Sequence, residues 1–393
     1  SSKEGTKLLE GGSSYANIYT GGAKKAKYCG ELNTFSHWAS ELSLFRLGNL
    51  ALLHPLTALR MGFLLLMEIG LSLYDAGKGI LLRGDILKEL SFIPARLAVA
   101  ISLREAIRAE VIEDIQEGLP IIHANFFGYD EAAHRRGPHS RFAHWTLKGI
   151  DRTLKSICQA TRKSSRRNYE IIIFSDHGQE AVIPYREAAH ETIQETIERL
   201  FSNQYFTLTA SDPLSAMMER SRKSIFTDDT HNSLETNPSK RKIRIHALGP
   251  VAHLYVENGL TESEKEEWAE RLCLQSEVPI VLFKNALRKI VCRHGKEQGT
   301  LDLLKNLLIK RGHQFPETTT TDLERMLATR YVGDLVFLGW RVNQKPLTFA
   351  EERGAHAGPG AEECRGFAML PASIKWDREW MRPIQLRHIA MKL

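Results

Sequence analysis

The sequence predicts an α/β fold in which helices cover both faces of a mostly parallel sheet. Short apolar runs with the length of buried strands alternate with longer segments that show the 3.6-residue periodicity of helices. Five strands are expected, at 121–127, 169–174, 251–256, 278–284 and 333–340. The chain has 393 residues, of which 42% are apolar and 25% are charged, so it is long enough to form one wide sheet with a large core.

A stretch rich in glycine and hydroxyl residues lies near the start of the chain, at residues 11–22. The backbone N–H groups of such a loop can cradle a phosphate. The stretch lacks the GxxxxGK[ST] pattern of nucleotide-binding loops, so an ordinary turn-rich connection is the alternative interpretation.

The most apolar part of the chain predicts a helix over residues 55–76 that begins at Pro55. Its uninterrupted apolar run, 61–67, is too short to span a bilayer, and Arg60 and Glu68 flank it. Apolar residues surround the middle turns of this helix. We therefore expect it to pack in the core or in an oligomer contact, or else to lie on a membrane surface.

A carboxylate and a histidine follow the first of the expected strands. A helix at 85–117 leads into the strand 121–127, and Asp130 and His134 come directly afterwards. In a helical turn, a spacing of four residues places both side chains on one face. A carboxylate oxygen and an imidazole nitrogen that converge there suit a zinc-like ion, although a helix cap or a local hydrogen bond is the alternative.

A second acid and histidine pair follows the strand 169–174. A helix at 139–161 and a polar run at 161–168 precede this strand, and the run has no interleaved aromatic residues that would stack nucleic-acid bases. The strand leads directly into Asp176 and His177. Gly178 permits a sharp turn there, at which both side chains can reach a shared ion.

The remaining segments carry the chain to a third histidine. A helix at 187–202 precedes the polar residues 210–247, which we interpret as a mobile insertion that either selects substrate or is a plain disordered loop. A further helix, 263–276, separates two of the expected strands. The last strand precedes His356, which stands between glycines in GAHAG and is either a loop residue or a ligand.

Three motifs therefore occur in order along the chain: YDEAAHRRGP, FSDHGQE and GAHAGPG. Together they resemble the type I phosphodiesterase and nucleotide pyrophosphatase branch of the alkaline phosphatase superfamily, and their conjunction is specific where each motif alone is not. The resemblance implies a three-layer sandwich with a mostly parallel central sheet between helices. It also implies that Asp130, His134 and His356 hold one metal ion. Asp176 and His177 would hold its neighbour.

The resemblance implies a metal-dependent hydrolase of phosphate esters, closest to a phosphodiesterase or nucleotide pyrophosphatase. Mixed Asp and His ligation favours zinc, with manganese second. In the family arrangement a Ser or Thr oxygen attacks phosphorus, and two ions about 4 Å apart clamp the attacking and leaving oxygens. Arg135 and Arg136 either attract the anionic substrate or are surface residues only.

One part of the family pattern is missing. The superfamily has an early metal-binding Asp and a Ser or Thr nucleophile after its first strand, and no such segment precedes the glycine-rich stretch. We therefore expect residues 1–393 to form a single, N-terminally incomplete domain. Ser13, Ser14 and Thr20 are substitute nucleophiles on chemical grounds. The alternative function is a non-catalytic metal-binding or membrane-associated form of the fold that lacks the nucleophile.

The net charge and the cysteine content limit the kinds of partner and the cellular compartment that we expect. The net charge of +6 suits a phosphate-bearing substrate or an anionic membrane surface, although a mild excess also serves solubility. The five cysteines are widely spaced and include no CxxC pair, which favours free thiols in a reducing compartment. No secretory signal is visible, so a cytoplasmic or membrane-associated location is expected.

Overall fold

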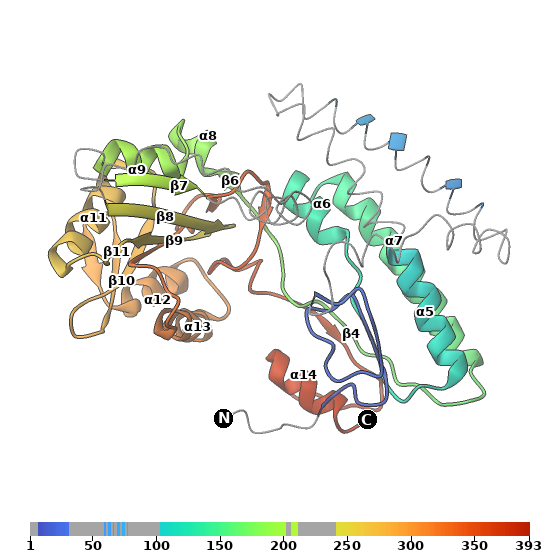
Figure 1. The fold of residues 1–393 in the computed structure, drawn as a ribbon. Helices are drawn as coiled ribbons and strands as arrows, with labels where there is room; N and C mark the ends of the chain where they lie inside the picture. Colours follow the sequence, from blue (N-terminus) through green and yellow to red (C-terminus); the bar gives the residue numbers. More distant parts are fainter. Residues whose placement is uncertain are drawn as a thin grey trace, which may run out of the picture. The chain divides into compact units, whose positions relative to one another are not determined.

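The computed structural model describes residues 7–30, 103–201, 206–210 and 241–393, together with the helical residues 59, 62, 63, 66, 69, 70, 73, 74 and 77 (Figure 1). The chain divides into two compact units. The first unit comprises Ser1–Glu131, Arg141–Phe174 and Ala368–Leu393, and the second comprises Ala132–Ser140 and Ser175–Phe367.

The first unit contains a small parallel sheet. Its strands are β1 (Ser13–Tyr15), β2 (Lys25–Lys27) and β3 (Ile122–Ala124), with β1 in the centre. β3 falls within the strand expected at 121–127, and its parallel pairing agrees with the prediction. A further pair in this unit, β4 (Ile173–Phe174) and β16 (Ala368–Met369), is antiparallel.

Two helices of the first unit pack against each other, α5 (Arg104–Glu117) and α7 (Arg141–Lys163). The apolar side of α5 contributes Ile107, Val111 and Ile115 to a core that also contains Tyr15 of β1. α5 ends at Gly118, whose φ of 80° lets its N–H donate to the carbonyls of the last turn. α5 begins inside the helix expected at 85–117, and residues 78–102 lie outside the described residues.

The second unit is built on a seven-stranded sheet with the order β12-β11-β10-β13-β9-β8-β7. The strands are β7 (Phe206–Ala210), β8 (Arg241–Leu248), β9 (Val251–Val256), β10 (Ile280–Lys284), β11 (Ile290–His294), β12 (Glu297–Gly299) and β13 (Leu335–Leu338). All neighbouring strands pair antiparallel except β7 with β8. For this sheet, the prediction of mostly parallel strands was wrong.

The short connections explain the antiparallel pairing. β8 and β9 are joined only by Gly249 and Pro250, and a two-residue hairpin can join only antiparallel strands. β9 and β10 do run in the same direction, with helix α11 (Glu262–Gln275) between them in the chain, as the alternation predicted. The late strand β13 lies between them and is antiparallel to both. The unit is therefore a split β-α-β arrangement.

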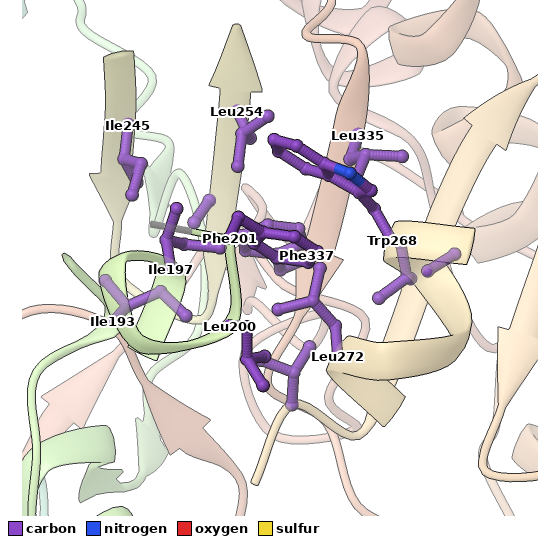
Figure 2. Close-up of a cluster of buried hydrophobic side chains, with 14 of the residues drawn as sticks. Ile193, Ile197, Leu200, Phe201, Ile245, Leu254, Trp268, Leu272, Leu335 and Phe337 are labelled. Carbon is purple, nitrogen blue, oxygen red and sulfur yellow. The ribbon is translucent and has the colours of Figure 1, made fainter. Parts of the chain in front are cut away.

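Helices cover both faces of this sheet. Helices α9 (Ile193–Phe201) and α11 pack on one face, where Phe201 stacks on Trp268 with ring centroids 3.9 Å apart (Figure 2). Helices α12 (Leu301–Lys310) and α13 (Pro316–Ala328) pack on the other face. Alternate residues of one strand serve the two cores, since Leu335 and Phe337 face the first core and Val336 faces the second.

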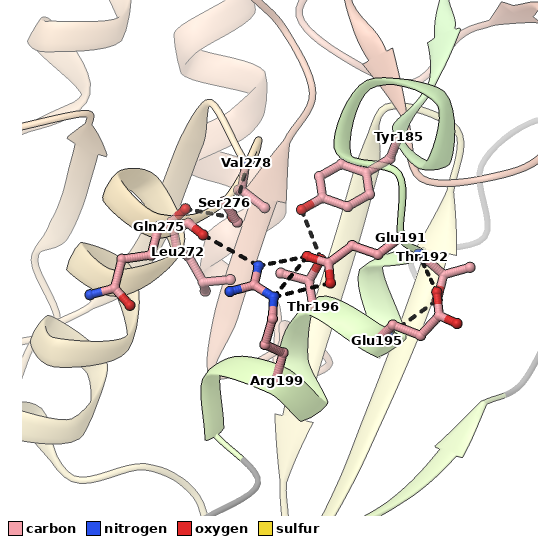
Figure 3. A network of polar contacts seen from close by, with 10 residues as sticks. All are labelled: Tyr185, Glu191, Thr192, Glu195, Thr196, Arg199, Leu272, Gln275, Ser276 and Val278. Atoms are coloured by element: carbon pink, nitrogen blue, oxygen red, sulfur yellow. Dashed lines mark hydrogen bonds and ion pairs between the residues drawn. The ribbon is translucent and has the colours of Figure 1, made fainter.

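A polar network ties α9 to its surroundings (Figure 3). The guanidinium of Arg199 donates to the carboxylate of Glu191 and to the carbonyl of Gln275 at the end of α11. The hydroxyl of Thr196 donates to Glu191 and lies 2.9 Å from the hydroxyl of Tyr185. Tyr185 opens helix α8 (Tyr185–Ala189), so this network fixes the segment that leads away from the second motif.

The two special segments of the chain are only partly described. Within the helix expected at 55–76, the residues described are helical, and the side chains of Leu59, Phe63 and Leu66 are exposed. Within the part of the chain that the structure describes, no helix combines the length and the apolar character needed to cross a membrane. Of the polar residues 210–247, positions 211–240 lie outside the described residues, and β8 begins at Arg241. All five cysteines are free.

Candidate metal centre

Helix α6 (Tyr129–Arg136) carries the first motif. Gly128 ends the preceding segment with a φ of 111°, and its N–H donates to the carboxylate of Glu131 in the first turn of α6. Acidic residues occupy the first turn and basic residues the last, which complements the helix dipole. The helix places Asp130 one turn before His134, on the same face, as the spacing predicted.

His134 is held by a carboxylate from a distant part of the chain. Its Nδ1 lies 2.7 Å from Oε2 of Glu352, and the other carboxylate oxygen of Glu352 accepts a hydrogen bond from the Thr348 hydroxyl at 2.7 Å. A carboxylate is only an acceptor, so Nδ1 of His134 donates. In the neutral ring the lone pair is then on Nε2, the nitrogen that can act as a metal ligand.

In the second motif, His177 also makes a hydrogen bond through its Nδ1 atom. Its Nδ1 lies 2.9 Å from the carbonyl oxygen of Gly178, so this nitrogen also donates and Nε2 carries the lone pair. Oδ2 of Asp176 lies 3.6 Å from that Nε2. The side chain of Asp176 is 72% exposed. The Nε2 atom of His177 and an accessible carboxylate oxygen of Asp176 therefore lie close together in this loop.

Short strands bring the second and third motifs together. β5 (Glu180–Ala181) pairs antiparallel with β15 (Gly354–Ala355), which places His177, just before β5, at the same end as His356, just after β15. The backbone N–H of Arg353 donates to the carbonyl of His134 at 2.6 Å. This hydrogen bond joins the last turn of α6 to the start of β15.

The three histidines form one cluster in the second unit. The rings of His177 and His356 are stacked with centroids 3.7 Å apart, and those of His134 and His356 meet edge to face at 4.9 Å. Ring nitrogens of His177 and His356 lie within 4.8 Å of each other. The histidine cluster, His134, His177 and His356, is therefore a set of imidazole nitrogens that fits a borderline ion such as zinc.

A buried glutamate shapes the loop after His356. The backbone N–H groups of Gly358 and Gly360 each donate to the carboxylate of Glu363 at 2.7 Å, and the N–H of Gly178 donates to the carbonyl of Glu363 at 3.0 Å. Burial raises the pKa of Glu363 to about 8. Burial also raises the pKa of the neighbouring Glu180. Hydrogen bonds to Glu363 thus connect the second motif to the third.

The structure brings together part of the predicted set. His134, Asp176, His177 and His356 all lie in the second unit, and Arg135 and Arg136 follow His134 on α6 with half-buried side chains. Asp130 belongs to the first unit. Ser13 and Ser14 are fully buried in β1, and Thr20 is half-buried. Glu352 and Glu363 were not predicted, since nothing in their local sequence distinguishes them from other acidic residues.

The protein therefore has a mixed α/β fold with a candidate metal centre, whose histidines and carboxylates come from separate segments of the chain. Residues 100–276 match the sequence model of the family described as type I phosphodiesterase / nucleotide pyrophosphatase, which is part of the alkaline phosphatase superfamily. The resemblance drawn from the three motifs is confirmed over that range. The matched range includes the first two motifs and ends before His356. No curated protein was found to match the chain significantly.

Proposed function

We propose that this protein is a metal-dependent hydrolase of phosphate esters, closest to a phosphodiesterase or nucleotide pyrophosphatase. The observation that carries the proposal is the histidine cluster, in which the ring of His356 contacts those of His134 and His177, although the three come from motifs far apart in the sequence. The family match over residues 100–276 supports a phosphoric ester as the substrate class.

We assign His134 and His356, with Asp130 on the same face of α6, to one ion, and Asp176 with His177 to a second. Zinc suits these nitrogen and carboxylate donors best, and manganese is second. When bound, such ions would polarise the phosphoryl oxygens and offset the negative charge that develops on them. The Nδ1 atoms of His134 and His177 donate to Glu352 and Gly178, so Nε2 is the nitrogen that we assign to the metal in each ring.

Arg135 and Arg136 are assigned to attract the anionic substrate, because they follow His134 directly on α6 and the planar guanidinium group matches the geometry of phosphate oxygens. Of the candidate nucleophiles, Ser13 and Ser14 have no exposed surface, and Thr20 keeps part of its side chain exposed. Thr20 is therefore the candidate that we retain.

The burial of Ser13 and Ser14 also favours the second candidate function, metal binding without turnover. The two functions share the histidine cluster and differ only in whether a nucleophile reaches phosphorus. We further propose that the parallel strands β2-β1-β3 belong to the central sheet of an alkaline phosphatase-like, three-layer fold. That residues 1–393 form one such domain, with a helix at 55–76 and an insertion near 210–247, stays a prediction.

Hydrolysis of bis-p-nitrophenyl phosphate with added zinc or manganese tests the proposal. We expect turnover in the wild type and its loss in His177→Ala and His356→Ala. His139→Ala is the matched control, because this exposed histidine lies outside the cluster. Zinc binding without turnover would favour the non-catalytic function. Turnover that survives both cluster variants would contradict the assignment of the cluster.

A further inference from the structure

Both carboxylate oxygens of Glu352 accept hydrogen bonds, one of them from a histidine of the candidate metal centre. Oε2 accepts from Nδ1 of His134 at 2.7 Å, and Oε1 accepts from the hydroxyl of Thr348 at 2.7 Å. The Thr348 oxygen in turn accepts from the backbone N–H of Ala350. Each atom of this short chain of hydrogen bonds therefore has a fixed role, and the carboxylate has little freedom to turn away.

The segment that carries Glu352 is also fixed by its backbone. Arg353 donates its N–H to His134 at 2.6 Å and accepts from the N–H of Val182 at 3.0 Å. The side chain of Arg353 pairs with Glu187. The Glu352 side chain is only 13% exposed, and that of His134 is 27% exposed, so water competes weakly for their hydrogen bond. The same segment reaches His356 four residues later.

We propose that Glu352 is a positioning residue, which holds His134 in the tautomer whose Nδ1 is protonated and whose Nε2 is the metal-binding atom. A free imidazole samples both tautomers, and it can rotate about its side-chain bonds. A carboxylate at Nδ1 selects one tautomer, fixes the ring plane and increases the basicity of the opposite nitrogen. The inference rests on the proposed metal-binding function of the histidine cluster.

The ¹⁵N chemical shifts of the histidine side chains in the metal-free protein test the tautomer directly. In the wild type, His134 should show a protonated Nδ1 and an unprotonated Nε2. In Glu352→Ala this pattern should shift toward a mixture of tautomers, whereas Glu352→Gln should keep it in part, because the amide oxygen can still accept from Nδ1. Glu351→Ala is the matched control, since Glu351 is the adjacent, exposed carboxylate.

Competition with a chelator for zinc tests the consequence. Loss of an outer-shell partner of a metal-binding histidine typically weakens metal affinity by about 10–100-fold, and we expect a weakening of this size in Glu352→Ala. Glu352→Gln should lie between Glu352→Ala and the wild type, and Glu351→Ala should match the wild type. Circular dichroism establishes that each variant is folded.

The two readouts separate the two claims. A His134 tautomer that is the same in Glu352→Ala and in the wild type would overturn the positioning role. Unchanged zinc affinity in a folded Glu352→Ala would overturn it as well. A tautomer that depends on Glu352, in a wild-type protein that binds no zinc, would uphold the positioning role and contradict the proposed function.

Discussion

At the scale of single residues, the histidines of the cluster differ in what holds them. His134 donates to a carboxylate, whereas His177 donates to a neutral backbone carbonyl. Charge-assisted hydrogen bonds are roughly twice as strong as neutral ones, so His134 is the more firmly oriented ring. His356 contacts both other rings and is the centre of the cluster.

Asp176 offers a test of ligand against structural role, because its side chain is 72% exposed. Asp176→Asn keeps an oxygen that can accept from the N–H of His177, so the free energy of unfolding should change by no more than ~0.5 kcal/mol. Zinc affinity should nevertheless fall by about 10-fold or more, since a ligand matters at least as much as an outer-shell residue. Titration calorimetry measures this, with Asp151→Asn as an exposed control. Zinc affinity equal to that of the wild type would remove Asp176 from the ligand set.

Glu363 predicts a pH dependence of stability. Its pKa is raised from 4.5 to about 8, so between these values the folded protein keeps a proton that the unfolded chain releases. The free energy of unfolding should therefore fall as the pH rises through this window. In Glu363→Gln the slope should be shallower, and in the control Glu351→Gln, at an exposed glutamate, it should stay as in the wild type. Urea unfolding at several pH values measures the slope, and equal slopes in the wild type and Glu363→Gln would contradict the raised pKa.

The three histidines of the cluster could be predicted from the sequence as candidate ligands, but the groups that contact them could not. His134, His177 and His356 stand beside strand ends and glycines, which are local signals. Glu352 contacts His134 across 218 positions of the chain, and a backbone hydrogen bond from the N–H of Arg353 to the carbonyl of His134 joins the two segments. A lone glutamate has no local pattern that reveals such a partner.

At the scale of elements, two glycines allow the close approach of segments around the cluster. A Cβ at Gly178 would lie 2.0 Å from the carbonyl oxygen of Glu362, and one at Gly354 would lie 2.3 Å from that of Ala133. Both obstacles are backbone atoms, which cannot turn aside as the end of a flexible side chain can. These glycines are needed for packing, whereas the sequence predicted only that Gly178 permits a sharp turn.

Gly178→Ala should therefore destabilise the protein by about 1–3 kcal/mol through overpacking, and should weaken zinc binding as the loop of His177 moves. Gly299→Ala is the control, because its added Cβ would make an ordinary contact 3.5 Å from the Leu303 side chain. Urea denaturation compares the two variants. Equal stabilities of both variants and the wild type would mean that the loop can adjust without cost.

The N-terminus of α11 predicts a smaller effect. The Thr261 hydroxyl accepts from the N–H of Glu264, and the Glu264 carboxylate accepts from the N–H of Thr261, which is a complete capping box. Thr261→Ala should cost ~1 kcal/mol of unfolding free energy, and Thr261→Ser should restore most of it. If denaturant midpoints of the two variants coincide, the cap does not contribute as the geometry indicates.

Elements were easier to predict than their pairing. The strands expected at 251–256, 278–284 and 333–340 contain β9, β10 and β13, and the helix between the first two is α11. The order of strands in a sheet depends on long-range contacts, however. The insertion of β13 between β9 and β10 leaves no periodic signal in the sequence, and the alternation of strands and helices was therefore taken for a parallel sheet.

At the scale of the whole molecule, the two compact units differ in their sheets. The first unit carries a three-stranded parallel sheet, and the second carries the mostly antiparallel sheet together with the histidine cluster. The family match covers parts of both units. The net charge of +6 would favour approach of an anionic ester from any side, an effect that salt screens.

The central claim is that the histidine cluster binds a metal ion, and X-ray absorption at the zinc edge of the zinc-loaded protein tests it most directly. We predict the multiple scattering typical of imidazole ligands in the wild type, and its reduction in a folded His356→Ala variant. A spectrum that shows thiolate ligands, or only carboxylate and water oxygens, would contradict the claim, as would an imidazole signal that is the same in His356→Ala.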